Sequence, residues 1–341
     1  MATANIKEVA RHAGVSVGTV SNVLNRPDSV APITRERVMT AIQQLGFVRN
    51  EAARHLRAGR SRTVGLVVLD VANPYFTDVA RGVEELADTH DTMVVLCNSG
   101  ENPERELRHL AQLEEQRVLG ILITPVATDN PHLDRLVERG IPVVLVDRGA
   151  TAQRCSVAVD DVLGGRLAGA HLAELGHRRL AFVGGPFSIK QVEDRYAGMQ
   201  AAMAEVADAH ITAIERPSLS VAEGSRAGEQ IAAMPDADRP TAVFCANDLL
   251  AIGLLQEMTR QGIKVPDDIA IVGYDDIGFA AAAAVPLSSV RQPREQLGRA
   301  AIELLLDEVE NQGVGDGHTH RQVVFEPELI VRESSQASRQ A

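Results

Sequence analysis

The sequence predicts an N-terminal all-α helix-turn-helix head, followed by a large α/β body of two parallel-sheet lobes. The head is predicted by apolar residues at helical spacing on both sides of a glycine turn in residues 5–25. The body is predicted by short β-branched runs that alternate with longer amphipathic stretches from Thr63 onward. These stretches cover about 270 residues, more than one parallel sheet usually takes, so two lobes are expected.

The first helix of the head is expected to begin after Asn5. Its apolar face consists of Ile6, Val9, Ala10 and Ala13. Asn5 can cap the helix, and Glu8, three residues later, can complete a capping box. Gly14 follows the last apolar residue, where a left-handed backbone is needed to end the helix.

A second helix is expected after Ser16, which can cap it. Its inner face consists of Val20, Val23 and Leu24, and its outward residues are Val17, Gly18, Ser21, Asn22 and Asn25. Pro27 prevents any extension of the helix. Two helices at this spacing are typical of a helix-turn-helix, whose second helix enters the DNA major groove. The spacing alone leaves an ordinary αα-hairpin as the alternative.

A third helix is expected from a Thr34 cap to Gly46, which ends it. Its buried stripe consists of Val38, Ala41, Ile42 and Leu45. Three helices with such stripes make a compact head of roughly the minimum size that folds alone.

The charge of the chain is divided unevenly. Net charge is −12, but residues 1–62 hold ten Lys or Arg and four acids, and the remainder holds 24 basic and 42 acidic residues. A basic head on an acidic body attracts phosphates at one end only and keeps the body away from the polyanion. The charge pattern therefore favours DNA binding by the head.

The cysteines are three scattered residues, Cys97, Cys155 and Cys245. An odd, scattered set predicts reduced thiols in a cytoplasmic protein, and neither a disulfide framework nor a zinc site. The N-terminus has no apolar segment of a signal peptide, and no apolar run reaches the length of a membrane span. We therefore expect no metal, no cofactor and no membrane partner.

The body is expected to consist of alternating strands and helices. The predicted strands are Val64–Leu69, Thr92–Asn98, Gly120–Thr124, Ile141–Val146, Leu180–Val183, Ala242–Cys245, Ile269–Tyr274 and a tail strand near Val323–Val331. Predicted helices include Phe76–His90, Val162–Leu175, Arg195–Ala207, Leu249–Gln261 and Pro293–Asn311. Such alternation is the signature of a parallel sheet with helices on both faces.

Short motifs in both parts of the chain resemble one family. In the head, EVA, AGVS and TVSNVLN, followed by TRERV, resemble the LacI/GalR family of transcription regulators. In the body, NPYF, VDR, DDVLGG, DRYAG, ANDLLAIG, VGYDD and VRQP resemble the effector domain of that family and the periplasmic sugar-binding proteins, the ribose-binding ones most closely. The resemblance implies a periplasmic-binding-protein-like body.

The resemblance also implies a function and a division of the chain. The protein is expected to be a homodimeric repressor of sugar uptake or catabolism genes, bound to a pseudo-palindromic operator and released by a ribose-like monosaccharide between the lobes. The expected segments are a head at 1–48, a hinge helix and linker at 49–62, an effector-binding and dimerisation domain at 63–335 and a polar tail at 336–341. The N-lobe would comprise about 63–160 and 291–320, and the C-lobe about 161–290 and 321–333.

The expected DNA contacts lie on the second helix and in the hinge. Ser16, Thr19 and Ser21 suit phosphates, which position a protein without specifying a sequence. Base reading falls to Val17, Gly18 and Asn22, of which Asn22 can pair with adenine, and Asn25 is the last outward residue of the helix. In the hinge, the residues expected at DNA are Asn50, Ala53, Leu56 and Arg57; the resemblance makes Leu56 a minor-groove wedge. A plain basic linker is the alternative there.

Candidate ligand-binding residues follow the ends of the predicted strands, where open α/β sheets bind ligands. They are Asn73, Tyr75, Phe76, Asp147, Arg148, Arg195, Asn247, Asp275 and Gln292. Acids, amides and guanidinium groups can engage neighbouring sugar hydroxyls in pairs, and the resemblance places these residues at ribose-type positions. The alternatives are helix caps for Asp161 and Asp248, solvation for Asp276, and ion pairs for the arginines.

Other functions remain as alternatives. Two arginines would also suit a sugar acid or a sugar phosphate, and binding of the effector could strengthen operator binding instead of relieving it. An enzyme is disfavoured because no dinucleotide-binding GxGxxG, P-loop or G-x-S-x-G motif is present. A transporter's solute-binding protein is disfavoured by the DNA-binding head. The end of the chain has no heptad repeat, so a dimer is expected and not a tetramer.

Overall fold

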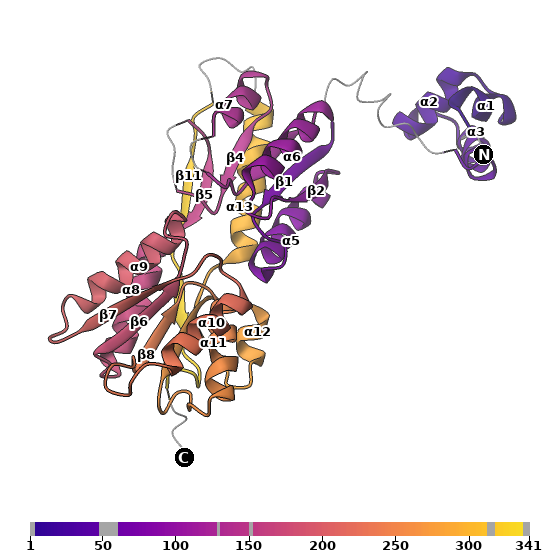
Figure 1. The fold of residues 1–341 in the computed structure, drawn as a ribbon. Helices are drawn as coiled ribbons and strands as arrows, with labels where there is room; N and C mark the ends of the chain where they lie inside the picture. The colour runs from indigo at the N-terminus through magenta and orange to yellow at the C-terminus, as the bar shows by residue number, and fades with distance from the viewer. Residues whose placement is uncertain (1–3, 48–60, 128–129, 150–152, 312–317, 337–341) are drawn as a thin grey trace. The chain divides into compact units, whose positions relative to one another are not determined.

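The structure is a computed structural model, which describes residues 4–47, 61–127, 130–149, 153–311 and 318–336. It divides into two compact units, Met1–Ser61 and Arg62–Ala341 (Figure 1). The first is the head and the second is the body. Among the helices that the structure describes, none combines the length and apolarity needed to span a bilayer.

The head contains helices α1 (Ile6–His12), α2 (Val17–Asn25) and α3 (Pro32–Leu45), with a 3₁₀ turn at Pro27–Ser29. Val9, Val20 and Val38, one from each helix, are fully buried together. This packing is what the predicted apolar stripes require, because each helix presents its stripe to the other two.

The caps of the first two helices agree with the sequence prediction. Asn5 and Glu8 form the capping box of α1, and the Ser16 hydroxyl accepts from the Thr19 amide at 3.1 Å. Gly14 has φ of +61°, a conformation that glycine adopts without steric cost. The predicted Thr34 cap is wrong, since α3 begins one turn earlier at Pro32, where the fixed φ of proline suits the first helical position.

The first lobe of the body is a six-stranded parallel sheet in the order β11-β5-β4-β3-β1-β2. Its strands are β1 (Thr63–Val68), β2 (Met93–Asn98), β3 (Gly120–Ile123), β4 (Val143–Val146), β5 (Ser156–Val159) and β11 (Gln322–Phe325). Its helices are α5 (Pro74–Thr89), α6 (Pro103–Glu115), α7 (Pro131–Glu138) and α13 (Arg294–Asn311).

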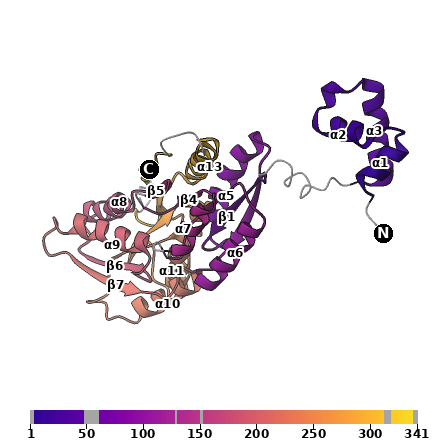
Figure 2. The ribbon, with the colours of Figure 1, turned by 90° about the horizontal axis from the view of Figure 1, so that it is seen from above.

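Helices cover both faces of this sheet (Figure 2). Along β3, Leu122 packs in the cluster with α5 and α13, whereas Ile121 and Ile123 pack in the cluster with α6 and α7. Successive side chains of a strand point to opposite faces, so a strand covered on both sides must be apolar at every position. That requirement explains the continuous apolar runs in the sequence.

The second lobe repeats this plan with the strand order β12-β10-β9-β8-β6-β7. Its strands are β6 (Arg179–Gly184), β7 (His210–Glu215), β8 (Ala242–Cys245), β9 (Ala270–Asp275), β10 (Ser288–Arg291) and β12 (Glu328–Ile330), and only β12 is antiparallel to its neighbour. Its helices are α8 (Asp161–Glu174), α9 (Lys190–Met203), α10 (Val221–Ala232), α11 (Asp248–Arg260) and α12 (Gly278–Ala282).

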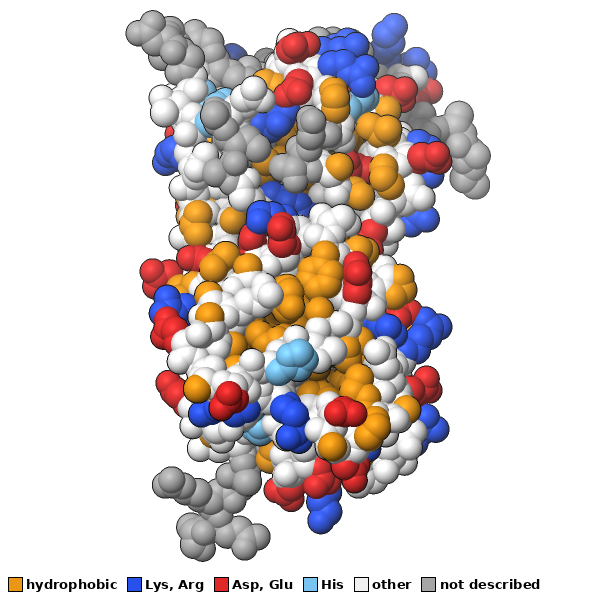
Figure 3. All heavy atoms as spheres, turned by 60° about the vertical axis from the view of Figure 1, so that its left-hand side comes forward, with side chains coloured by type: hydrophobic (Ala, Val, Ile, Leu, Met, Phe, Trp, Pro, Cys, Tyr) orange, Lys and Arg blue, Asp and Glu red, His pale blue; other side chains and the backbone are white. Residues whose placement is uncertain are grey.

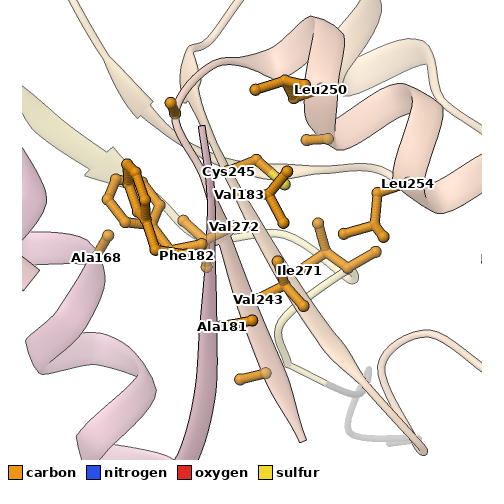
Figure 4. Close-up of a cluster of buried hydrophobic side chains, with 14 of the residues drawn as sticks. Ala168, Ala181, Phe182, Val183, Val243, Cys245, Leu250, Leu254, Ile271 and Val272 are labelled. Carbon is orange, nitrogen blue, oxygen red and sulfur yellow. The ribbon is translucent and has the colours of Figure 1, made fainter. Parts of the chain in front are cut away.

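Side chains of the second sheet also alternate between two helical layers. Phe182 points toward Ala168 of α8, whereas Val183 lies on the side of Leu250 and Leu254 of α11 (Figure 4). All four of the apolar residues Phe182, Val183, Leu250 and Leu254 are fully buried. The second lobe therefore has its own two-sided core.

The tail of the chain divides between the two sheets. β11 pairs with β5 in the first lobe, and β12 pairs with β10 in the second. The single predicted tail strand is therefore wrong, and so is the assignment of the β11 residues to the C-lobe. Pro327 lies between the two strands, and proline cannot donate a ladder hydrogen bond, so the strand ends there and the chain crosses to the other lobe.

Three strands, β5, β7 and β10, were not predicted from the sequence. β10 reads SSVR, and its serines are fully buried. Ser288 and Ser289 bury their hydroxyls by hydrogen bonding to the Arg332 carbonyl and to Asp248. Such partners come from distant parts of the chain, so no local pattern indicates the strand.

Three pairs of helices pack at very short range through glycines. In the α8–α9 pair, an added Cβ at Gly165 would lie 2.0 Å from the Arg195 carbonyl oxygen, and one at Gly198 would lie 2.0 Å from the Val162 carbonyl oxygen. Reciprocal glycines also join α5 to α13 and α10 to α11. Only glycine allows the helix backbones to approach this closely.

Candidate functional site

A cavity of about 410 Å³ lies in the body, lined by residues of both lobes. This volume is within the usual range for small-molecule sites, near its lower end. Eight of the nine candidate residues line it: Asn73, Tyr75, Phe76, Asp147, Arg195, Asn247, Asp275 and Gln292. The structure thus brings together most of the strand-end residues, as the position rule for open α/β sheets predicts.

Arg148 is the candidate residue that does not line the cavity. Its guanidinium donates to the Pro125 carbonyl from Nε at 3.2 Å and from Nη2 at 2.9 Å, and to the Asp147 carbonyl at 2.9 Å. The side chain is buried and satisfies loop carbonyls. Its partners are therefore backbone groups of its own lobe.

Arg195 on α9 is held in place by three partners. It donates from Nε to Asp161 at 2.8 Å and from Nη1 to the Ala246 carbonyl at 2.7 Å, and its guanidinium lies 3.7 Å from the centre of the Tyr274 ring. A guanidinium fixed by an acid and an aromatic face is pre-organised. The Asp161 carboxylate also offsets part of the positive charge of Arg195.

The helix cap of α8 is Asp160, whose carboxylate accepts from the Leu163 amide. Asp161 therefore does not act as the cap, which was its alternative role in the sequence. At α11 the cap is Asn247, which also donates to the Leu219 carbonyl at 3.1 Å. Asp248 accepts from Ser289 and from the Ile277 amide and is not among the cavity residues.

Two hydrogen-bonded contacts join the lobes across the cavity. Gln191 of α9 donates to the Asp147 carbonyl at 2.6 Å and to Asp147 Oδ2 at 3.1 Å. Asn73 donates to Asp275 at 3.4 Å, and Gln292 donates to the other carboxylate oxygen of Asp275 at 2.7 Å. The cavity walls are therefore linked through amide-to-acid contacts.

The two central acids have unusual backbone and electrostatic settings. Asp147 has φ of +53° and Asp275 has φ of +102°, conformations that cost a non-glycine residue some backbone strain. Burial raises the pKa of Asp275 to about 6, against the opposing effects of Arg195 and of hydrogen bonds from Gln292 and Asn73. Burial also raises the pKa of Asp147, and Arg148 and Arg195 oppose that rise.

Two buried amide oxygens on cavity-lining residues, Gln191 Oε1 and Gln292 Oε1, have no hydrogen-bond partner among the described residues. A buried polar atom without a partner costs about 1–3 kcal/mol, so these acceptors are suited to a ligand that donates hydrogen bonds. Beside them, the Tyr75 hydroxyl and the Asp147 carboxylate interact with each other.

Several cavity residues were not identified from the sequence: Asp70, Asn98, Glu101, Arg105, Gln191, Ser218 and Ser220. Asp70 and Asn98 stand at the ends of β1 and β2, so the strand-end rule would have found them. Gln191 lies in the first turn of α9, and its contact with Asp147 depends on how the two lobes approach each other. No signal in the local sequence indicates that contact.

The outward face of α2 is the candidate DNA interface. Val17, Gly18, Asn22 and Asn25 are exposed. The Asn25 amide donates to the Ser21 carbonyl and hydroxyl at 2.9 and 3.1 Å, which fixes both side chains on one ridge. Thr19 and Ser16 are linked through their hydroxyls at 3.0 Å. The hinge residues Asn50, Ala53, Leu56 and Arg57 lie outside the described residues.

Two family models match the chain. Residues 5–50 match the model described as bacterial regulatory proteins, lacI family, and residues 170–335 match the model of a periplasmic binding protein-like domain. The first match covers the helix-turn-helix, and the second covers most of the second lobe and the tail strands.

Individual relatives match over most of the chain. The HTH-type transcriptional repressor PurR of Photobacterium profundum is 34% identical over 97% of this chain and 98% of its own length. A lac repressor dimer bound to operator and the anti-inducer ONPF superposes with a TM-score of 0.82 at 26% identity, over 98% of this chain and all of that chain. A LacI-family regulator from Enterococcus faecium with bound ribose gives a TM-score of 0.72 at 26% identity, over 80% of this chain and 98% of that chain.

Proposed function

The chain belongs to the lacI family of bacterial regulatory proteins and is a DNA-binding transcription repressor with an effector-binding domain, not an enzyme; from this premise we propose that its effector is a neutral monosaccharide. The observation that carries the proposal is the set of buried polar groups in the cavity: the unpartnered amide oxygens of Gln191 and Gln292, and the Tyr75–Asp147 pair beside them. Sugar hydroxyls donate readily to such acceptors, and a sugar hydroxyl can also accept a hydrogen bond from the Tyr75 hydroxyl.

The charge of the cavity favours a neutral ligand over an anion. Its lining carries four acids, Asp70, Glu101, Asp147 and Asp275, and two arginines, Arg105 and Arg195. Arg195 is already paired with Asp161, and Arg148 donates to backbone carbonyls away from the cavity. A sugar acid or phosphate would meet an excess of negative charge, which disfavours it.

An aromatic wall supports a ring-shaped ligand. Tyr75 and Phe76 lie with ring centroids 5.1 Å apart in an edge-to-face pair. Both line the cavity at the start of α5. An aromatic surface suits the C–H face of a sugar, while the amides and acids opposite it suit the hydroxyls. Among monosaccharides we propose a ribose-like one, in line with the ribose bound by the Enterococcus faecium relative.

The effector acts, in this proposal, by favouring one arrangement of the lobes. Gln292 lines the cavity and lies in the crossover between β10 and α13, so a ligand that bonds to it acts directly at a connection between lobes. The lobe arrangement then sets the spacing of the two hinges in a homodimer, and operator binding is relieved. A ligand shifts this balance only through its different affinities for the two arrangements.

The operator would be a pseudo-palindrome that is read by the two heads of a dimer. The protein would act in the cytoplasm, where that DNA lies. Support comes from the lac repressor relative, which binds its operator as a dimer, because a two-fold protein reads a two-fold site. The proposed reading residues are Val17, Gly18 and Asn22, with Ser16, Thr19, Ser21 and Asn25 at the backbone. In the hinge the proposed contacts are Asn50, Ala53, Leu56 and Arg57.

Operator release by sugars tests this function. The full-length protein is bound to a fluorescent operator from its own upstream region, and ribose, other pentoses, hexoses and deoxyhexoses are titrated while anisotropy is followed. Release by one neutral sugar is expected. In Asp147→Ala the sugar concentration for half-release should rise about tenfold to a hundredfold, the worth of a hydrogen bond to a charged group, with operator binding unchanged.

Asp88→Ala is the matched control, because Asp88 is an exposed acid on α5 that does not line the cavity. It should respond to sugar as the wild type does. Tighter operator binding on adding sugar would make the effector a corepressor. Release only by sugar acids, sugar phosphates or purine bases would overturn the neutral-sugar assignment.

A further inference from the structure

A cluster of four side chains lies in the first lobe, outside the effector cavity. Cys155, Glu308, His318 and His320 place one sulfur, one oxygen and two nitrogen atoms within 4.8 Å of one another. Cys155 Sγ lies 3.1 Å from His318 Nε2 and 3.8 Å from His320 Nδ1, and His318 Nε2 lies 3.9 Å from Glu308 Oε2. The four atoms thus surround a single small volume.

Three separate segments supply these side chains. Cys155 directly precedes β5, Glu308 is on the last turns of α13, and the two histidines are in the segment that leads into β11. The Ser156 amide donates to the Arg321 carbonyl at 3.0 Å, which brings the starts of β5 and β11 together (Figure 1). His318 and His320 are two residues apart, so in an extended chain they face the same side.

The cluster buries an acid beside a thiol. Glu308 is 5% exposed, its side chain contacts the Cys155 thiol, and its Oε2 lies 3.9 Å from His318 Nε2. Burying a carboxylate without a closely paired cation is costly. Cys155 is fully buried, yet it receives the Arg321 amide at 3.4 Å, a contact that also stabilises a thiolate. Both features are explained if a cation occupies the centre of the cluster.

From this geometry we propose that Cys155, Glu308, His318 and His320 form a tetrahedral Zn²⁺ site. Sulfur, imidazole nitrogen and carboxylate oxygen are the ligands that zinc prefers. Ordinary zinc–ligand lengths of about 2.0–2.3 Å put tetrahedral ligand atoms roughly 3.3–3.8 Å apart, and the observed distances bracket that range. The thiolate and carboxylate together also balance the charge of the ion.

The site would fasten the edge of the first sheet. Among the described strands, β11 lies at the edge of the sheet and pairs with β5 alone. The metal would tie the segment before β11 to α13 and to the start of β5. All four ligands come from the chain itself, which is typical of a structural zinc site. The sequence prediction of no zinc site would then be overturned, since ligands from position 155 to position 320 form no recognisable motif.

Metal binding to the untagged full-length protein tests the proposal. The protein is stripped with a chelator, and Zn²⁺ is titrated in competition with a chromophoric chelator. One Zn²⁺ per chain is expected. Cys155→Ser and His318→Ala should each weaken binding by about a hundredfold or more, since the loss of even an indirect partner of a zinc ligand costs tenfold to a hundredfold.

Cys97→Ser and His210→Ala are the controls, because these residues lie on β2 and β7, away from the cluster. Both should bind Zn²⁺ as the wild type does. Substitution with Co²⁺ should give a thiolate-to-cobalt charge-transfer band and the intense visible bands of tetrahedral cobalt, with the charge-transfer band absent in Cys155→Ser. A wild-type protein that binds no Zn²⁺, or binds it equally well as Cys155→Ser, would show that the cluster is only a hydrogen-bonded thiol–imidazole group.

Discussion

Adjacent acids at the end of β9 occupy opposite electrostatic settings. Asp275 is buried against the cavity, and its pKa is raised to about 6. Asp276 also experiences burial, but hydrogen bonds from Arg332 and Arg291 outweigh it and lower its pKa. Neighbouring residues of the same type therefore contribute to stability with opposite dependence on pH.

The free energy of unfolding should report this contrast in the absence of effector. The native state holds a proton on Asp275 up to about pH 6, whereas the unfolded chain releases it near pH 4. The contribution of Asp275 to the free energy of unfolding therefore falls by roughly 3 kcal/mol as the pH rises from about 4 to 6. In Asp275→Asn that fall should disappear, as measured by denaturant unfolding at a series of pH values.

The Asp276→Asn variant should show the opposite dependence of stability on pH. A lowered pKa contributes stability above the unfolded pKa of about 4, and this contribution is lost as pH falls. The variant should therefore be less stable than the wild type at neutral pH and approach it in acid. If the two variants changed the pH profile in the same direction, the electrostatic assignment of both residues would be wrong.

Helix packing is set by single glycines. An added methyl group at Gly198 would overlap the Val162 carbonyl oxygen, so α8 and α9 would have to move apart. Overpacking of this kind costs about 1–3 kcal/mol. Gly198→Ala should thus lower the Tm of the body by about 2 to 10 °C in thermal unfolding, although alanine favours the helical conformation more than glycine does.

Gly278→Ala is the matched control, because no atom lies within 4 Å of the added Cβ there. It should leave the Tm close to that of the wild type. An equal loss of Tm in both variants would mean that the glycines matter for backbone conformation and not for helix contact.

Elements differ in how far the sequence predicts them. The strands β3 and β8 contain no polar side chain, and β1 contains none after Thr63, so their sequence specifies a buried strand. β10 depends on partners far along the chain, such as Arg332 for the Ser288 hydroxyl. The sequence analysis predicts one tail strand near Val323–Val331, whereas the chain divides at Pro327 between two sheets.

The cavity residues also differ in how far the sequence predicts them. The strand-end rule locates Asn73, Asp147 and Asp275, because parallel strands all end at one edge of a sheet. It also selected Arg148, since the sequence does not show which way a side chain turns once the strand has ended. Gln191 contacts Asp147 only because the second lobe lies against the first, and that is a property of the assembled body.

At the scale of the whole molecule, we propose the β2 edge of the first sheet as a contact between two copies of the chain. Met93 is 61% exposed and Leu96 is 43% exposed on this strand, and an uncovered apolar edge invites pairing with another chain. Hydrophobic side chains also gather on one face of the second lobe, in the lower half of Figure 3. In a homodimer on a two-fold operator, contact between the two copies would bury such apolar surfaces.

A charge placed on the β2 edge should therefore weaken the homodimer. In Met93→Asp the dimer dissociation constant is expected to rise at least about tenfold, since an unpaired charge is costly to bury; sedimentation velocity over a concentration series measures it. Val324→Asp is the matched control, because Val324 is 60% exposed on β11 at the opposite edge of the same sheet. A dimer weakened by Val324→Asp alone would move the contact to that edge.

The two strands of the tail belong to different sheets, and this has a consequence for synthesis on the ribosome. β11 and β12 are edge strands of different lobes and lie at Gln322–Phe325 and Glu328–Ile330. Neither sheet can be completed until almost the entire polypeptide has been translated, whereas the DNA-reading head emerges first and can fold early. A nonsense codon anywhere between the head and Gln322 would thus release a chain with a head able to fold and both effector lobes unfinished.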